Sequence, residues 1–329
     1  MARVVVVTGA SAGVGRAVAR MLGAHGDAVG LIARGRDGLE EAAREIEAAG
    51  GRALVLPLDV ADADAVEAAA ARVEAELGPI YAWVNNATVS VFSPIAQMTA
   101  EEFRRVTEVT YLGYVHGTLT ALRRMRPRDR GVIVQVGSAL AYRGIPLQSA
   151  YCAAKHAAEG FTASLRCELI HDRGGVRVTM VELPAMNTPQ FTWSRSRMPR
   201  KAQPVPPIFQ PEVGAAAVVR AIREAPREVY VAPPTWVAIV GNKLVPGLYD
   251  RILARTGYDD QMTGEPAGER PDNLFAPLPG DHGAHGPFDT RALDRPSQAV
   301  IRTLAGWVRG LFITLVAELR ALIREQEPA

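Results

Sequence analysis

Short runs of Val, Ile and Leu alternate with longer Ala-rich segments from residue 3 to about residue 182, and this alternation constrains the fold most. The apolar runs carry no polar alternation, as expected for strands of a parallel sheet that helices cover on both faces. The intervening segments repeat apolar residues at intervals of three and four, the period of an amphipathic helix. The order predicts successive βαβ units and therefore an α/β fold with a doubly wound parallel sheet.

The positions of these elements follow from the same pattern. Strands are predicted at residues 4–7, 29–33, 53–57, 82–84, 132–136 and 176–181, and helices at 14–25, 37–49, 62–77, 99–125 and 150–170. Thr99 and Glu102 have the spacing of a capping box at the start of the fourth helix. Residues 184–211 hold seven prolines and predict a surface loop, after which a helix at 211–225 and a strand at 228–232 complete the core.

The last ninety-seven residues form an extension beyond this core, and we divide the chain into residues 1–232 and 233–329. A helical segment is predicted at 234–256, while 263–298 holds six prolines and five glycines and is expected to be mostly irregular. Ser297 then caps a long helix whose apolar positions form one stripe, at 301, 304, 308, 311, 312, 315, 319 and 322. The stripe fits packing on its own domain or a subunit contact better than a membrane surface.

Composition places the chain among globular proteins and restricts its partners. Of 329 residues, 48% are hydrophobic and 22% are charged, which excludes collagen-like, disordered and disulfide-rich classes. Thirty-seven Lys and Arg against thirty-five Asp and Glu leave a net charge of +2, too small to indicate nucleic-acid binding. Cys152 and Cys167 have neither the spacing of a metal site nor the density of a secreted disulfide scaffold. The N-terminal apolar run is too short for a secretory signal. Both observations lead us to expect a cytoplasmic protein. The best candidate for a membrane span, 304–317, is interrupted by Arg309.

A glycine-rich turn joins the first predicted strand to the first predicted helix. Gly9, Gly13 and Gly15 lie in the sequence Thr-Gly-Ala-Ser-Ala-Gly-Val-Gly, which starts at Thr8. Glycines allow positive φ and close backbone approach, and the unpaired N–H groups at a helix N-terminus bind phosphate. In this strand-turn-helix context the turn predicts a nucleotide pyrophosphate site. A tight turn without a ligand is the alternative.

The residue that ends the second strand indicates which dinucleotide binds. Folds of this kind place the group that contacts the adenosine ribose about twenty residues after the turn. The sequence has no acid at this place to bind the ribose hydroxyls of NAD, and instead has Arg34, with Arg36 nearby. A guanidinium pairs well with the 2′-phosphate of NADP, so we expect NADP rather than NAD. Ala12 adds no second basic group, and a solvated surface arginine is the alternative interpretation.

Five separated motifs together resemble the short-chain dehydrogenase/reductase family over residues 3–232. They are the glycine turn, Asp59 after the third strand, the run Asn85, Asn86 and Ala87, Ser138, and Tyr151 with Lys155 four residues later. The resemblance implies a Rossmann-type fold, an NAD(P) cofactor and catalysis by Ser138, Tyr151 and Lys155. It also implies a set of cofactor-binding residues, namely Gly9, Ser11, Gly13, Val14, Gly15, Arg34, Asp59, Val60, Asn86, Ala87, Tyr151, Lys155, Pro184 and Thr188.

The chemistry of the three catalytic candidates also follows from their residue types and spacing. Hydride transfer to a carbonyl needs a proton donor at the developing alkoxide, and the usual tyrosine pKa of about 10 is too high for efficient catalysis at neutral pH. Lys155 lies at i+4 from Tyr151 on one helical face, and its ammonium is expected to lower the tyrosine pKa. Ser138 ends a strand beside that helix and can orient the substrate oxygen.

Three positions depart from the family pattern. An asparagine that usually contributes to a proton relay through the lysine is replaced here by Thr110. A hydroxyl holds a water with less geometric definition than an amide, so a less defined relay is expected. Thr88 follows the Asn-Asn-Ala run in place of a glycine, and Ala185 follows Pro184 in place of a glycine.

The expected substrate contacts are mostly apolar. They are Val89, Val91, Phe92, Leu140, Ile145, Phe191 and Trp193, and they favour a hydrophobic carbonyl or alcohol. The basic cluster of Arg195, Arg197, Arg200 and Lys201 is interpreted as a solvated loop rather than an anion site. His282 and His285 lack the accompanying ligands of a metal site, so no metal is predicted, and Cys152 is expected to pack in the core.

The sequence therefore predicts an NADP-preferring oxidoreductase that interconverts an alcohol and a carbonyl. A different reaction of the family, such as epimerisation or C=C reduction, is one alternative, and an NADP-binding regulatory or scaffold protein is another. The expected partner is a small-molecule substrate, with no nucleic acid. The resemblance also implies a homo-oligomer formed through the helices at 99–125 and 150–170.

Overall fold

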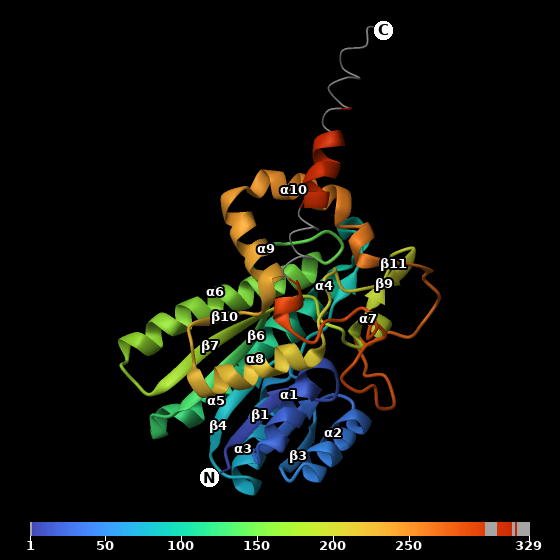
Figure 1. Cartoon of the computed structure of the whole chain (residues 1–329). Helices are drawn as coiled ribbons and strands as arrows, with labels where there is room; N and C mark the ends of the chain where they lie inside the picture. Colours follow the sequence, from blue (N-terminus) through green and yellow to red (C-terminus); the bar gives the residue numbers. More distant parts are fainter. Residues whose placement is uncertain (1, 300–307, 318–319, 321–329) are drawn as a thin grey trace.

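A seven-stranded parallel sheet forms the centre of the molecule (Figure 1). The structure is a computed structural model and describes residues 2–299, 308–317 and 320. The strands of this sheet are β1 (Val4–Thr8), β2 (Ala28–Ala33), β3 (Arg52–Pro57), β4 (Ile80–Asn85), β6 (Gly131–Ser138), β7 (Val176–Leu183) and β10 (Glu228–Tyr230). They lie in the order β10-β7-β6-β4-β1-β2-β3, so the chain reverses its direction of growth between β1 and β4.

Helices cover both faces of the sheet, which confirms the predicted doubly wound α/β fold. One face carries α1 (Gly13–Ala24), α2 (Arg36–Ala48) and α8 (Pro211–Glu224), whose apolar residues share one buried cluster. The other carries α3 (Ala63–Glu76), α4 (Ala100–Thr107), α5 (Gly113–Met125) and α6 (Ser149–His171) around a second cluster. Burial on both faces explains why the strands are continuous apolar runs.

The helix predicted at 99–125 is divided by a turn of π-helix at Glu108–Leu112, between α4 and α5. The predicted capping box is present at its start. The Glu102 amide donates to the Thr99 hydroxyl at 3.2 Å, and the Thr99 amide donates to the Glu102 carboxylate at 2.9 Å. Periodicity missed the π turn because a single extra residue changes the apolar spacing very little.

The region predicted as a surface loop at 184–211 contains short elements instead of a plain connector. They are α7 (Gln190–Trp193), β8 (Arg195–Ser196) and β9 (Arg200–Ala202). β8 pairs with β5 (Val91–Phe92), and β9 pairs with β11 (Met262–Pro266) of the extension. Short 3₁₀ turns lie at Ile95–Gln97, Arg126–Arg128, Ala139–Ala141, Asp259–Gln261 and Pro296–Ala299.

The interpretation of the basic cluster as a solvated loop was wrong for Arg195 and Arg197, whereas Arg200 and Lys201 form exposed surface pairs. Arg195 and Arg197 both donate to the Glu102 carboxylate, at 3.1 and 2.8 Å, and that carboxylate is only 2% exposed. Arg200 pairs with Asp259, and Lys201 pairs with Glu265 at 2.6 Å. Acidic partners from α4 and from the extension satisfy all four cations, and those partners are too far away in sequence to be recognised from a local pattern.

The predicted helical segment at 234–256 is two helices, α9 (Ala232–Leu244) and α10 (Pro246–Thr256). The division falls at Pro246, because a proline lacks the N–H needed to continue a helix. The stretch at 263–298 is mostly irregular, as predicted, and a 3₁₀ turn occupies the place where Ser297 was expected to cap a helix. Residues 308–317 are helical, whereas stripe positions 301, 304, 319 and 322 lie outside the described residues.

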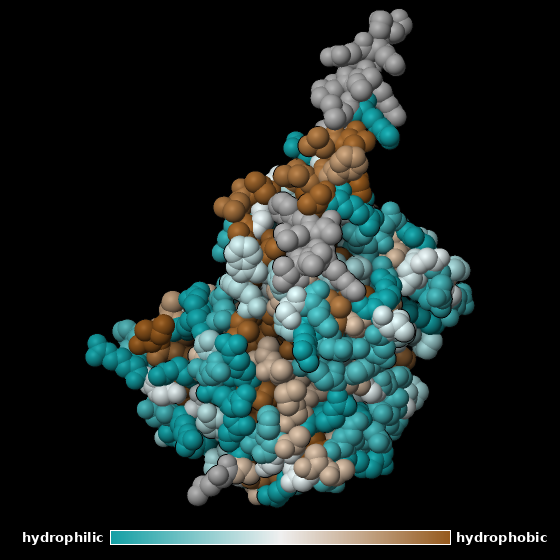
Figure 2. Space-filling model, viewed as in Figure 1, coloured by the Kyte–Doolittle hydropathy of each residue, from teal (hydrophilic) through white to brown (hydrophobic). Residues whose placement is uncertain are grey.

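The extension packs against the core through several buried side chains. Leu274 belongs to one of the two main clusters, and Ala284, Leu293 and Ala299 belong to the other. Exposed apolar residues gather around α9, α10 and helix 308–317, including Trp236, Leu244, Val308, Phe312 and Leu315 (Figure 2). Among the described helices, none is both long and apolar enough to cross a membrane.

The buried Glu102 carboxylate predicts an acid-sensitive link between α4 and the 195–197 segment. Its arginine partners outweigh burial and lower its pKa from 4.5 to about 2, so its stabilising contribution is complete above pH 4.5 and is lost as the pH falls towards 2. Glu102→Gln is therefore expected to lower the free energy of unfolding by about 1–3 kcal/mol at pH 7. The difference from wild type should shrink between pH 4.5 and 2. Glu101→Gln, at an exposed neighbouring position, is the control, and an equal loss in both variants would contradict this role.

Candidate active site

A pocket of about 510 Å³ lies at the carboxyl ends of the parallel strands. It extends from the glycine turn, past Arg34, to Ser138 and Tyr151. In doubly wound folds ligands bind where the strand order reverses, which is here between β1 and β4. The pocket therefore brings the predicted cofactor residues and the predicted catalytic residues into one continuous space.

The glycine turn at the end of β1 leaves room for a phosphate group. Gly9 and Gly13 have φ angles of +68° and +58°, which side chains other than glycine rarely adopt. A Cβ atom on Gly15 would lie 2.1 Å from the Gly9 carbonyl oxygen, so α1 can begin this close to β1 only with glycine. Ser11, Gly13 and Val14 line the pocket at the N-terminus of α1, the end of a helix that favours an anion, although the Gly13 amide itself donates to the Gly283 carbonyl at 3.1 Å.

Hydrogen bonds connect this turn to the end of β4. The Thr8 hydroxyl accepts from the amides of Asn86 and Ala87 at 2.9 and 3.0 Å, and the Asn86 side chain donates to the Thr8 carbonyl at 2.9 Å. Pro184 and Thr188 also line the pocket, from beyond β7. All the residues that the family resemblance assigned to the cofactor except Gly15 line this one cavity, and its glycine turn fits a dinucleotide.

Arg34 and Asp59 lie together at the other end of this cofactor region. Arg34 donates to the carbonyl oxygens of Asn273 and Leu274, and Asp59 pairs with Arg105. Burial lowers the pKa of the Arg34 guanidinium, and the charges of Asp59 and Arg105 act in opposite directions on it. Val60 lines the same wall. Arg36 does not: it is exposed and pairs with Glu40 at 3.4 Å, so the expectation that it assists Arg34 was wrong.

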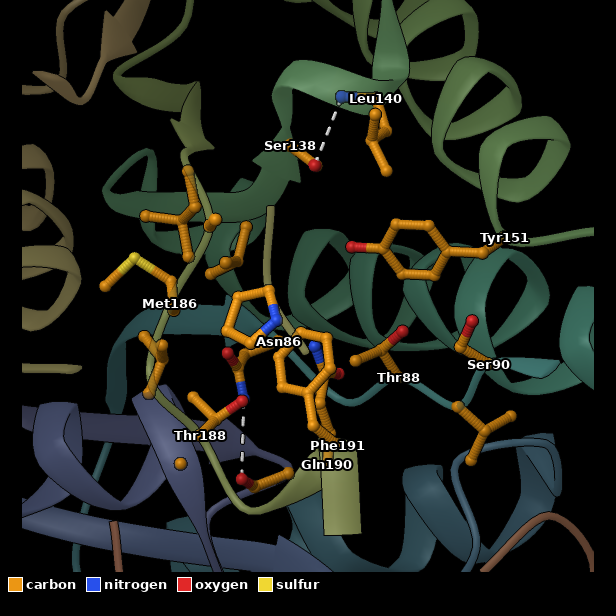
Figure 3. A pocket seen from close by; sticks show the side chains of 18 of the residues that line it. Asn86, Thr88, Ser90, Ser138, Leu140, Tyr151, Met186, Thr188, Gln190 and Phe191 are labelled. Atoms are coloured by element: carbon orange, nitrogen blue, oxygen red, sulfur yellow. Dashed lines mark hydrogen bonds between the residues drawn. The ribbon is translucent and has the colours of Figure 1, made fainter. Parts of the chain in front are cut away.

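The hydroxyls of Ser138 and Tyr151 face the same part of the pocket (Figure 3). Ser138 ends β6, and its oxygen accepts from the Leu140 amide at 3.2 Å, which leaves its proton free for another acceptor. Tyr151 projects from the first turn of α6. Asn86, Thr188 and other lining residues stand across the cavity from this pair, so a substrate oxygen can reach both hydroxyls.

Lys155 lies one turn after Tyr151, with its ammonium 5.6 Å from the centre of the tyrosine ring. The side chain is 2% exposed, and Nζ donates to the Tyr114 hydroxyl at 2.9 Å and to the Val136 carbonyl at 2.7 Å. Burial lowers the pKa of Lys155 to about 7. The ammonium is thus held rigidly beneath the tyrosine by groups that cannot leave the core.

The expectation that Lys155 lowers the pKa of Tyr151 does not hold for the protein alone. Burial is the largest influence and raises the pKa of Tyr151 above its usual value. A hydrogen bond with Ser138 acts in the opposite direction but is outweighed. A tyrosine in this environment carries its proton at neutral pH, and this is the form needed by a proton donor.

Thr110, at the position where the family has asparagine, is turned away from Lys155. It lies fully buried in the π turn, where its hydroxyl donates to the Val89 carbonyl at 3.0 Å and accepts from the Val89 amide at 3.1 Å. Tyr114 is the residue that contacts the ammonium instead, one turn further along the chain. No sequence pattern indicated Tyr114, because its contact with Lys155 depends on how α5 and α6 pack around the end of β6.

Glu182 is a second residue that the sequence analysis missed. It lies on β7 beside β6, with no exposed surface, and a Cβ atom on Gly137 would lie 2.2 Å from its carboxyl oxygen. Burial raises its pKa to about 8, although the charge of Lys155 and the Ser138 backbone act to lower it. An acidic residue inside an otherwise apolar predicted strand was the available signal.

The substrate end of the pocket is largely apolar, but its members differ from those predicted. Val89, Leu140, Ile145 and Phe191 line it, as do residues of the extension, namely Pro234, Val237, Ala238, Tyr249 and Leu253. Trp193 also lines the pocket, but it contacts Asn273 and His282 beside the cofactor region. Val91 and Phe92 were wrongly included: both pack inside hydrophobic clusters, because β5 pairs with β8. Ser90 and Gln148 add polar groups to the lining.

Contacts fix the extension to the loop that precedes α6. Arg143 donates to Asn242 at 3.0 Å and to Asp250 at 2.7 Å, which joins this loop to α9 and α10. Gln148 donates to Gln261 at 2.7 Å. The extension therefore helps to shape the space in front of Ser138 and Tyr151.

The remaining candidates lie in structural contacts. His285 bridges Glu212 and Asp289 at 2.9 and 3.1 Å, and the rings of His282 and Trp193 make a T-shaped contact with their centres 4.7 Å apart. Among the described residues, no group of three or more side chains is arranged to hold a metal ion. Cys152 is buried, which raises the pKa of its thiol to about 11 and keeps it protonated.

Comparisons with known proteins agree with this geometry. A family model described as short chain dehydrogenase matches residues 3–198. The chain is 30% identical over 318 residues to the uncharacterized oxidoreductase YxnA of Bacillus subtilis, covering 93% of this chain and 89% of that protein. It is 29% identical over 229 residues to a fatty acyl-CoA reductase of Acinetobacter baylyi, covering 69% and 75%. A solved metagenomic short-chain oxidoreductase in complex with NADP is similar with a TM-score of 0.59 and 30% identity, covering 70% of this chain and 96% of that chain.

The chain belongs to the short-chain dehydrogenase family. It is an NAD(P)-dependent oxidoreductase that acts on a small-molecule substrate. The family match ends at residue 198, whereas the relative YxnA aligns over most of the extension as well.

The buried Glu182 predicts that stability falls as the pH rises from about 4.5 to about 8. Its pKa is raised by folding from 4.5 to about 8, so its contribution to stability is complete below pH 4.5 and is lost as the pH rises through about 8. Glu182→Gln removes this titration, and the variant should gain about 1 kcal/mol or more relative to wild type between pH 6 and about 9. Chemical denaturation across this range measures the difference. Glu168→Gln, at an exposed position of α6, should show no such trend, and a wild-type protein that gains stability relative to Glu182→Gln would indicate an ionised Glu182.

Proposed function

We propose that the protein is an NADP-preferring oxidoreductase that interconverts a carbonyl and an alcohol on an apolar substrate. The observation that carries this proposal is the meeting of the Ser138 and Tyr151 hydroxyls in a pocket continuous with the glycine turn and Arg34. A bound nicotinamide supplies or accepts the hydride. The two hydroxyls hold the substrate oxygen and exchange a proton with it.

The environment of Tyr151 supports carbonyl reduction as the favoured direction. The Ser138 hydroxyl, whose oxygen already accepts from Leu140, is hydrogen-bonded to Tyr151 in the protein alone and can turn to donate to the carbonyl oxygen and fix its position. Tyr151 keeps its proton until negative charge develops on that oxygen, because burial disfavours the phenolate. The ammonium of Lys155, held by Tyr114 and Val136, then stabilises the phenolate that the transfer leaves behind.

The charge around Arg34 supports NADP over NAD. Within the described part of the chain, no carboxylate lies at ion-pairing distance from Arg34, and its hydrogen bonds go to two backbone carbonyls. Placing a guanidinium in the pocket wall without a paired anion is costly unless a ligand supplies the charge. A 2′-phosphate does so, and it also forms charge-assisted hydrogen bonds.

The lining of the substrate end supports an apolar substrate. Most of its side chains are aliphatic or aromatic, and α9 and α10 supply several of them. The related Acinetobacter baylyi protein is named a fatty acyl-CoA reductase, which is consistent with a long apolar chain beside a reducible carbonyl group. We therefore propose lipophilic aldehydes and ketones as the first substrates to test.

Replacing Tyr151 by Phe tests the catalytic assignment. Removing the proton donor is expected to reduce kcat about 10²–10⁴-fold on lipophilic aldehydes or ketones, while NADPH still binds. Consumption of NADPH by absorbance and binding by its fluorescence measure the two properties on one sample. Turnover retained by Tyr151→Phe would refute this mechanism. Nucleotide binding by wild type without turnover on any carbonyl would favour a regulatory or scaffold role.

Replacing Arg34 by Ala tests the cofactor preference. The variant should bind NADPH about 10–100-fold more weakly and NADH with unchanged affinity, because only NADPH carries the 2′-phosphate. Fluorescence titration with each nucleotide gives both constants. Arg36→Ala removes a similar charge from the exposed Glu40 pair and should change neither constant. An equal loss for both nucleotides in Arg34→Ala would contradict the assignment.

A further inference from the structure

A segment of the extension lies across the cofactor end of the pocket. Residues 272–283, which we name the strap, run beside α1 and α2 in the orange-red part of the chain (Figure 1). Five of its residues line the same pocket as the glycine turn, namely Asn273, Pro277, Leu278, Gly280 and His282. The strap lies far beyond the part of the chain that the family model matches.

The first end of the strap is anchored at the adenosine side of the pocket. Arg34 donates to the carbonyls of Asn273 and Leu274, and Arg105 also donates to the Leu274 carbonyl, at 3.1 Å. The Leu274 side chain has no exposed surface and belongs to the cluster that contains Val60. The strap therefore holds the guanidinium of Arg34 at the place where it would meet a 2′-phosphate.

The other end of the strap is anchored at the phosphate side. Asp281 accepts from Arg16 at 2.8 Å, and Arg16 is only 1% exposed. The Gly280 amide donates to Asp37 at 2.7 Å, and the Gly13 amide of the glycine turn donates to the Gly283 carbonyl at 3.1 Å. Hydrogen bonds therefore hold the strap both at Arg34, on the adenosine side of the pocket, and at Gly13, on the phosphate side. The prolines in the middle of the strap lie between these two anchors.

One polar atom of the strap, the side-chain oxygen of Asn273, is available to accept a hydrogen bond from a ligand. The side-chain oxygen of Asn273 is buried and accepts no hydrogen bond from the described residues, although Asn273 lines the pocket. A buried amide oxygen without a donor is unfavourable, and a ligand hydroxyl or amino group would satisfy it. Adenosine offers both kinds of donor.

From these contacts we propose that the strap forms the outer wall of the adenosine end of the cofactor site and controls the exchange of NADP. The nucleotide enters and leaves when Leu274 withdraws from its cluster and the strap lifts from Arg34. This inference rests on the proposed binding of NADP. It predicts that fixing the strap slows nucleotide exchange, whereas loosening it speeds exchange and weakens the discrimination between NADPH and NADH.

The geometry provides a reversible lock for a direct test. A Cβ atom placed on Gly35 would lie 3.6 Å from the Cβ of Pro277, within the usual range for a disulfide. Gly35 has φ of −79°, which cysteine adopts without strain. The paired substitutions Gly35→Cys and Pro277→Cys, in a Cys167→Ser background, therefore allow oxidation and reduction of one folded protein. Release is measured by stopped-flow fluorescence when NADPH-loaded protein meets excess NADP⁺.

The oxidised protein should release NADPH at least tenfold more slowly than the reduced protein, and the single Gly35→Cys variant should show no such dependence on oxidation. Loosening the strap gives the opposite result: Leu274→Ala should release NADPH at least tenfold faster than wild type. Leu22→Ala, an equally buried leucine of α1 outside the pocket, controls for lost packing and should release at the wild-type rate.

Equal release rates for the oxidised and reduced proteins, with NADPH bound by both, would overturn the role of the strap and leave the proposed function intact. The same conclusion would follow if Leu22→Ala accelerated release as much as Leu274→Ala. If wild type bound no NADPH at all, the proposed function itself would fail.

Discussion

The close approach of Gly15 to the carbonyl of Gly9 is the constraint on which the rest of the site depends. A single methylene at Gly15 would overlap that carbonyl, so only glycine lets α1 start directly at the end of β1. This places the first turn of α1 beside Asn86, at the point where the strand order reverses. The parallel register then carries Arg34, Asn86 and Ser138 to the same edge of the sheet from β2, β4 and β6, with β1 and its glycine turn between β2 and β4.

Burial shapes the chemistry at the far end of the pocket. Lys155, Tyr151 and Glu182 lie close together in an environment that penalises charge on each of them. Such a site holds a protonated tyrosine beside Lys155, whose amino group has a pKa of about 7 and is fixed by the hydroxyl of Tyr114. The charge that develops during proton transfer is then met by a group that needs no reorganisation, which is the main advantage of a preorganised site.

The sequence predicted the parts of the protein that depend on local spacing. The strands, the glycine turn, the capping box at Thr99 and the i+4 pair of Tyr151 and Lys155 are all encoded within a few residues. Contacts between segments that are distant in the sequence could not be predicted from it. Glu102 meets Arg195 and Arg197 across more than ninety residues, and Arg34 meets Leu274 across 240. Proline and glycine content correctly predicted an irregular chain at 263–298, but it contained no information on where that chain would pack.

The central claim is that hydride passes between NADPH and a carbonyl carbon within this pocket, and isotope transfer tests it most directly. Wild-type protein is incubated with NADPH deuterated at both C4 positions and with a panel of lipophilic aldehydes and ketones, and the products are examined by mass spectrometry. We expect one deuterium on the carbon that bears the new hydroxyl group, and about 10²–10⁴-fold slower formation of this labelled product with Tyr151→Phe. Deuterium on the β carbon of an intact carbonyl compound, or none in any product despite bound NADPH, would contradict this mechanism.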